Sequence, residues 1–169
     1  PGKLSYASSG NGASSHLAGV LFNNTAGTDF QHIPYKGTGP ALTDLLGGQV
    51  AMTFTDVLTA LPHIKSGKQR ALGVTTLSLS GEVPTVAEQG VSGFDVSVFF
   101  GIVAPAGTPK DVIDKLNRAF ADALKQPDVR QTLLAQGLEF APSTTPEQLA
   151  GFIQSEVAKW HAVVQKSGA

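Results

Sequence analysis

The chain has 169 residues, 41% hydrophobic residues, a formal net charge of −1 and no cysteine. This length is sufficient for one medium domain or two small ones, each with a hydrophobic core. The balance of acids and bases, without a Lys/Arg cluster, argues against nucleic-acid binding, and no apolar run approaches the roughly 20 residues that span a bilayer. Lack of cysteine excludes disulfides and thiol chemistry but fits a cytoplasmic or a periplasmic protein equally well.

The first half of the chain alternates apolar runs with helical patterns. Strands are expected at 4–8, 30–35, 50–55 and 70–76. A helix is expected at 14–26, a shorter one in PALTDLLGGQ ended by Gly47 and Gly48, and a helical or irregular return in VLTALPHIKSGK ended by Gly67. Alternation at this pace favours an α/β fold of right-handed βαβ units around a parallel or mixed sheet.

The second half begins with a Gly-, Ser- and Pro-rich stretch after Thr76. That stretch has room for a short helix at 84–89, and a long apolar strand is expected from about 95 to 104. Amphipathic helices are then expected at 109–126, where Thr108 would be the N-cap and Pro109 the first helical residue, in PDVRQTLLAQG, and at 146–166. A brief strand, LEFA, would separate the last two helices.

The turn after the first predicted strand reads SSGNGASS and is rich in glycine and in hydroxyl groups. The following helix N-terminus leaves about four backbone N–H groups without partners, which favours binding of a carboxylate or phosphate. The same residues would also suit a flexible turn with Ser14 as the helix N-cap. The motif is neither a Walker loop nor a dinucleotide fingerprint, because the residues that those motifs require are missing.

Two further polar turns follow the next predicted strands. Tyr35, Lys36 and Gly37 begin the second turn, and Thr55 and Asp56 begin the third. In open α/β sheets ligands bind outside the carboxyl ends of the strands, so three such turns are expected to converge on one crevice. This convergence favours a binding site over three unrelated loops.

Catalytic and metal-binding motifs are not apparent. The four histidines, His16, His32, His63 and His161, fall on separate predicted elements without metal-ligand spacing, and a lone histidine is more often structural. No GxSxG elbow is present, and no nucleophile is paired with a base in the local sequence. We therefore expect no catalytic residue, no metal and no cofactor.

Several blocks of the chain resemble the Bug/TctC family, the periplasmic solute receptors of tripartite tricarboxylate transporters. The matching blocks are GKLSYASSGNGASSHLAGVLF, HIPYKGTGPALTDLLGGQV, ALPHIKSGKQRALGVTT, VPTVAEQG and GIVAPAGTPKDVIDKLNRAF. The resemblance implies a type II periplasmic-binding-protein fold, whose two α/β lobes close on a small organic carboxylate. It also implies that the second lobe's share of the ligand site includes Ser8, Ser9, Gly10, Gly12, Ser14, Tyr35, Lys36, Gly37, Thr55 and Asp56.

The chain departs from the family pattern in three respects. Family receptors are nearly twice as long, so we expect a fragment that lacks the N-terminal half of lobe 1, with lobe 2 at 1–93 and the C-terminal part of lobe 1 at 94–169. The block between VTT and VPT is usually a few residues longer and often carries Arg, whereas this chain has LSLSGE there. The family often has Asp where Thr55 stands, so ligand preference does not transfer.

The resemblance implies solute capture without catalysis, in the periplasm, with delivery of the carboxylate to membrane permease subunits. The backbone amides of Gly10 and Gly12 and the serine hydroxyls would bind the carboxylate, and Tyr35 and Lys36 would orient or neutralise it. Two alternatives remain open: an enzyme acting on a small anion at the same turns, and a ligand-free interaction module. The apolar segment 94–169 is expected to make the fragment self-associate.

Overall fold

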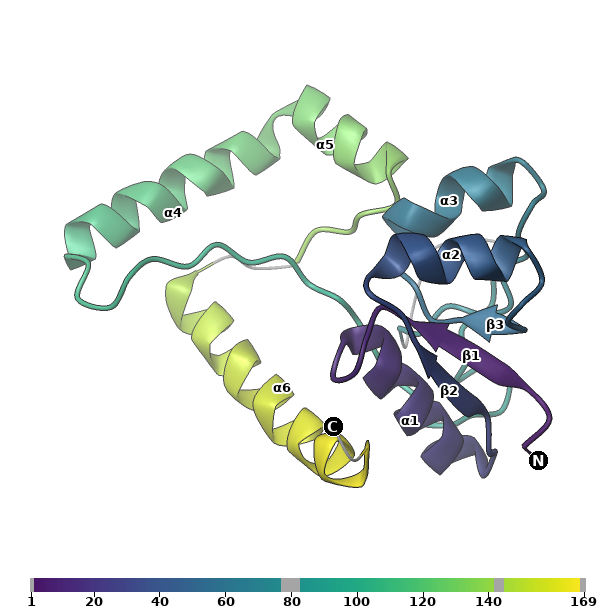
Figure 1. The fold of residues 1–169 in the computed structure, drawn as a ribbon. Coiled ribbons are helices and arrows are strands. Elements are labelled where there is room, and N and C mark those ends of the chain that lie inside the picture. The colour runs from purple at the N-terminus through teal and green to yellow at the C-terminus, as the bar shows by residue number, and fades with distance from the viewer. Residues whose placement is uncertain (1, 77–82, 142–144, 168–169) are drawn as a thin grey trace. The chain divides into compact units, whose positions relative to one another are not determined.

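The computed structural model describes residues 2–76, 83–141 and 145–167 (Figure 1). The chain forms two compact units, one of Pro1–Val98 with Trp160–Ala169 and one of Phe99–Lys159. The predicted division into lobe 2 at 1–93 and part of lobe 1 at 94–169 stays a prediction. The block LSLSGE lies outside the described residues.

The first unit is built on a three-stranded parallel sheet of order β2-β1-β3 (Figure 1). Its strands are β1 (Ser5–Ser8), β2 (Gln31–Pro34) and β3 (Met52–Thr53). Three helices alternate with them: α1 (Ser14–Ala26), α2 (Thr38–Leu46) and α3 (Val57–Lys65). The predicted βαβ alternation is confirmed, although the third strand is only two residues long.

The core lies on both faces of the central strand, because successive side chains of a strand point to opposite faces. Ala7 packs with Ala41 of α2 and with Val50. Tyr6 faces α1 on the other side, and a Cβ added at Gly19 would collide with its ring, so glycine permits the close approach of helix and sheet. A second cluster is formed by Ala18, Phe94 and Val96, with Trp160 packed against it.

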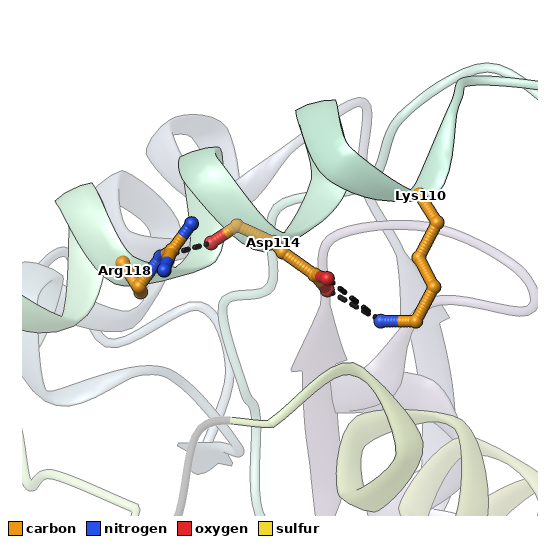
Figure 2. Close-up of polar contacts among 3 residues, drawn as sticks. All are labelled: Lys110, Asp114 and Arg118. Atoms are coloured by element: carbon orange, nitrogen blue, oxygen red, sulfur yellow. Dashed lines mark hydrogen bonds and ion pairs between the residues drawn. The ribbon is translucent and has the colours of Figure 1, made fainter.

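The second unit consists of helices joined by irregular chain. Its elements are α4 (Lys110–Lys125), α5 (Pro127–Ala135) and most of α6 (Pro146–Ser167), which confirms the three helices predicted for this half. None of the described residues between 99 and 159 is buried. A Lys110–Asp114 ion pair with Nζ–Oδ2 at 2.7 Å stands on the surface of α4, where Arg118 also donates to the Asp114 carbonyl (Figure 2).

Several predicted elements are wrong. Segment 70–76 makes a single bridge, Val74 to Thr85, rather than a strand, and 84–89 forms turns instead of a helix. Segments 95–104 and 138–141 are irregular. Apolar composition alone does not make a strand, because the backbone N–H and C=O groups need a neighbouring strand to pair with.

Two predicted helix caps are also wrong. Helix α1 begins at Ser14 itself, and its N-cap is Ala13, which makes no side-chain cap hydrogen bond. The N-cap of α4 is Pro109, while the Thr108 hydroxyl donates to the Pro105 carbonyl at 2.8 Å. Within the described residues, no helix has both the length and the apolarity to cross a membrane.

Candidate functional site

The first polar turn leads from the carboxyl end of β1 to the first residue of α1. Ser8, at the end of the strand, is fully buried, whereas Ser14 is exposed. The Ser9 backbone N–H donates to Ser15 Oγ at 2.9 Å, and the two hydroxyls of this pair lie 3.0 Å apart. The contacts between Ser9 and Ser15 therefore close the turn, and Ser14 does not cap the helix.

The glycine amides of this turn have partners inside the chain. The Gly10 N–H donates to Ser8 Oγ at 3.2 Å, and the Gly12 N–H donates to His16 Nδ1 at 3.0 Å. Gly12 adopts φ 74°, in the left-handed region that side-chain-bearing residues rarely occupy. To bind a carboxylate directly, either glycine N–H would have to give up its hydrogen bond to the Ser8 or His16 side chain.

Two histidines that the sequence places on separate elements come together beneath this turn. The His16 ring of α1 stacks on the His32 ring of β2, with centroids 4.0 Å apart and planes 12° apart. His32 Nε2 lies 2.6 Å from Ser8 Oγ, and the Tyr6 ring stacks on His32 at 5.1 Å. The expectation that no hydroxyl is paired with a base is therefore wrong for Ser8 and His32.

The sequence carries one part of the signal for this cluster, because Tyr6 and Ser8 are two residues apart and so point to the same face of β1. In the sheet register of the structure His32 pairs with Tyr6, which places it on that face, the one that α1 covers. Local motif spacing could not reveal the cluster, because 24 residues separate Ser8 from His32. Only the strand register brings them together.

Burial decides the charge of the two imidazoles. Desolvation lowers the pKa of His16, which is 5% exposed. Desolvation and then the neighbouring His16 lower the pKa of His32 from 6.5 to about 4. Both rings are therefore neutral at pH 7.

The second turn is tied to the first by backbone hydrogen bonds. The Tyr35 N–H donates to the Ser8 carbonyl at 3.0 Å, and the Gly37 N–H donates to the Ser9 carbonyl at 3.0 Å. The Tyr35 hydroxyl donates to Asp44 Oδ2 at 2.7 Å, and this hydrogen bond is the main cause of its raised pKa. Lys36 is exposed, and the described part of the chain gives it no ion-pair partner.

The third turn follows β3 at the same edge of the sheet. Asp56 is the N-cap of α3, and its Oδ1 accepts the Thr59 N–H at 2.9 Å and the Thr59 hydroxyl at 2.7 Å. The Thr55 hydroxyl is buried and has no hydrogen-bond partner among the described residues. Asp56 thus has a structural role in the helix cap, whereas Thr55 has a free hydrogen-bonding group.

The structure therefore brings the first two predicted turns into direct contact and places the third at the same sheet edge through the parallel strand order. Among the described residues, no group of His, Asp and Glu side chains could hold a metal ion. Neutral hydroxyls, backbone amides and one exposed cation are groups that can bind an anion.

All 169 residues match the family model described as "Tripartite tricarboxylate transporter family receptor". The chain belongs to this family. It is 40% identical over 172 residues to protein BugT of Bordetella pertussis, a match that covers all of this chain and 52% of BugT. The chain spans about half the length of the relatives that it matches first.

Solved structures of this receptor family have the same fold. An R. palustris protein with adipate is 32% identical, with a TM-score of 0.88 over 99% of this chain and 57% of that protein. MatC from Rhodopseudomonas palustris with bound malate is 35% identical, with a TM-score of 0.81 over 96% of this chain and 57% of MatC. Periplasmic binding proteins are among the other matches. The predicted family and the predicted fold, an α/β chain of the periplasmic-binding-protein type that covers part of the receptor, are confirmed.

Proposed function

We propose that this chain is part of a periplasmic receptor that binds a small organic carboxylate and delivers it to the membrane permease of a tripartite tricarboxylate transporter. The observation that carries the proposal is the match of the whole chain to the receptor family, together with its likeness to structures that hold adipate and malate. Both of those ligands are dicarboxylates, so we propose a dicarboxylate or a related acid as the solute.

The geometry of the three turns supports an anion as the ligand. In parallel sheets a ligand site lies at the carboxyl ends of the strands, where all three turns stand. Ser14 and Lys36 are exposed, so both reach solvent without rearrangement. The proposed ligand site comprises Ser8, Ser9, Gly10, Gly12, Ser14, Tyr35, Lys36, Gly37, Thr55 and Asp56, of which Ser8 and Asp56 shape the turns rather than contact the ligand.

Binding without turnover fits the burial of Ser8. A hydroxyl 2.6 Å from an imidazole is the arrangement that nucleophilic catalysis uses, and it favours the enzyme alternative. Ser8 is 0% exposed, however, so its oxygen does not reach a substrate outside the turn. We therefore propose a receptor rather than an enzyme, and product formation in a mixture of small esters and acids would overturn this choice.

The test of the receptor proposal is calorimetry with malate and adipate, supported by thermal shift because a ligand of the folded state raises its stability. Replacing Lys36 by Met should weaken binding at least about tenfold, since a charge-assisted hydrogen bond shielded from water is worth about 1.5–3 kcal/mol. Lys3→Met is the matched control, because Lys3 precedes β1 at the opposite end of the strand. Equal losses of affinity in the two variants, or no loss in either, would mean that Lys36 does not contact the ligand.

We propose self-association for the 169-residue chain. The segment after Val98 exposes large apolar side chains, among them Phe100 at 74% and Val103 at 80%. Patches of this kind mark protein contact surfaces. Light scattering at micromolar concentration should report a dimer or larger species for the unchanged chain. The double variant Phe100→Glu, Val103→Glu should be a monomer under the same conditions. A wild-type monomer would refute the proposal.

A further inference from the structure

The His16–His32 stack contacts the candidate carboxylate turn at two points. The first point is the Gly12 N–H, which donates to His16 Nδ1 at 3.0 Å. Because Nδ1 accepts this hydrogen bond, it carries no proton, and the proton of a neutral His16 is on Nε2. The backbone of the turn thereby selects one tautomer of the ring.

The second point of contact is the Ser8 hydroxyl. It lies 2.6 Å from His32 Nε2 and accepts the Gly10 N–H at 3.2 Å. Its own proton has two acceptors within reach, His32 Nε2 and the Gly10 carbonyl at 3.2 Å. Ser8 therefore connects the His32 ring to the backbone of the turn in either arrangement.

We propose that His16 and His32 are positioning residues of the carboxylate site, which as a stacked neutral pair hold the turn from Ser8 to Gly12 in its binding shape through the Gly12 amide and the Ser8 hydroxyl. This proposal rests on the proposed receptor function. The turn contains two glycines with positive φ, so without these hydrogen bonds its backbone samples many conformations. Ordering such a segment during binding weakens affinity, and holding it in advance avoids that loss.

The arrangement requires a neutral His16 ring and is incompatible with two charged rings. Protonation of His16 at Nδ1 would set a ring N–H against the Gly12 N–H, so that two donors face each other. Charging both rings would place two positive charges in a stack 4.0 Å apart. The surroundings do not favour a charged ring, since desolvation lowers the pKa of both histidines.

Among the described residues, the titratable side chain that contacts the pair is Tyr6 of β1. Tyr6 of β1 stacks on His32, and its hydroxyl donates to the His16 carbonyl at 3.3 Å. Burial raises the pKa of Tyr6 to about 12, so Tyr6 is neutral as well. Within the described residues, no Asp or Glu forms an ion pair with either histidine.

The test uses two substitutions of one residue. His16→Phe keeps an aromatic ring for the stack but removes the acceptor, whereas His16→Asn keeps an acceptor, Oδ1, near the place of Nδ1. Hydrogen exchange of the Gly12 amide is measured in both variants and in the unchanged chain at pH 7.5, with the Ala7 amide of β1 as the measure of an intact fold. Affinities for malate and adipate are measured by calorimetry at pH 7.5.

We expect Gly12 to exchange at least about tenfold faster in His16→Phe than in the unchanged chain, with Ala7 unaffected, and His16→Asn to restore most of the protection. Carboxylate affinity should fall about tenfold in His16→Phe and recover in His16→Asn. A role in packing alone would not predict the recovery in His16→Asn.

The proposal is overturned if His16→Phe, with Ala7 still protected, leaves Gly12 protection or carboxylate affinity unchanged, or if His16→Asn fails to recover. If Ala7 loses its protection in His16→Phe, His32→Phe decides instead, since Phe keeps a ring for the stack but has no hydrogen-bonding group for Ser8. Carboxylate affinity equal to that of the unchanged chain would then contradict the proposal. If the unchanged chain binds neither malate nor adipate, the receptor proposal fails for this chain, while the exchange of Gly12 still decides whether His16 positions the turn.

Discussion

The two units of the chain differ in how much of their helices they bury. Helix α1 in the first unit buries His16, Ala18 and Gly19 against the sheet. Helix α4 in the second unit has a regular apolar stripe, yet it buries no residue, and Val112, Leu116 and Phe120 of the stripe are 41–44% exposed. An amphipathic pattern thus specifies a surface that can be buried, but it does not supply the partner that buries it.

The two units also differ in what stabilises them. The first unit orders its backbone around two apolar clusters and a sheet, so the loss of conformational entropy is offset by burial. None of the described residues at 99–159 is buried, so its helices rely on local hydrogen bonds, surface ion pairs and partly exposed aromatic contacts such as that of Phe99 with Phe152. We therefore expect substitutions in the first unit to change the free energy of unfolding more than matched substitutions in the second.

The largest expected effect compares two phenylalanines. Phe94 is 0% exposed and Phe120 is 43% exposed. Phe94→Ala should lower the free energy of unfolding by about 3–5 kcal/mol through lost burial and a cavity, whereas Phe120→Ala should lower it by less than about 1 kcal/mol. Denaturant unfolding of both variants measures the difference. A loss at Phe120 as large as at Phe94 would show that α4 is buried in solution.

Two helical glycines, one in each unit, have different surroundings. An added Cβ at Gly19 of α1 would collide with the Tyr6 ring, whereas at Gly151 of α6 it would meet nothing within 4 Å. Gly19→Ala should destabilise the fold by about 1–3 kcal/mol through overpacking. Gly151→Ala should stabilise its helix by about 0.5–1 kcal/mol, because alanine has the higher helix propensity. Thermal unfolding curves of the two variants should move in opposite directions.

A third prediction concerns pH and tests the first unit alone. The unfolded chain takes up a proton on His32 near pH 6.5, but the folded chain keeps this ring neutral down to about pH 4. The free energy of unfolding should therefore fall as pH is lowered from about 6.5 to about 4, by roughly 2 kcal/mol after allowance for partial exposure, and His32 should contribute no further change below that. Chemical unfolding of the wild-type chain and of His32→Gln across this range measures the contribution, and equal pH slopes would contradict it.

The smallest expected effect lies on the surface of the second unit. Lys110 and Asp114 form the ion pair in Figure 2, with side chains 79% and 43% exposed. Such pairs are screened by solvent, and the cation here stands at the N-terminal end of its helix, where the helix dipole disfavours it. Lys110→Met should leave the unfolding midpoint unchanged within error at physiological salt. A clear loss of stability would mean that this surface is shielded from water.

Local sequence patterns predicted the strands at β1 and β2 and the helices α1, α4 and α6, because hydrophobic periodicity and helix-stop residues depend on only a few neighbouring positions. The same patterns marked the three polar turns, since parallel strands bring their carboxyl ends to one edge. The family was also evident from sequence, because its motifs are contiguous blocks. These features depend on residues close together in the chain.

Only the tertiary structure decided the rest. Segment 95–104 looks like a strand but is irregular, because a strand exists only where another strand accepts its hydrogen bonds. The Ser8–His32–His16 cluster joins three separate elements, and strand register and the packing of α1 bring them within bonding distance. The Gly10 and Gly12 amides, open donors in the sequence interpretation, are occupied by that cluster. The sequence by itself thus determined which residues stand at the turns, whereas contacts between distant residues decided which of their atoms are left for a ligand.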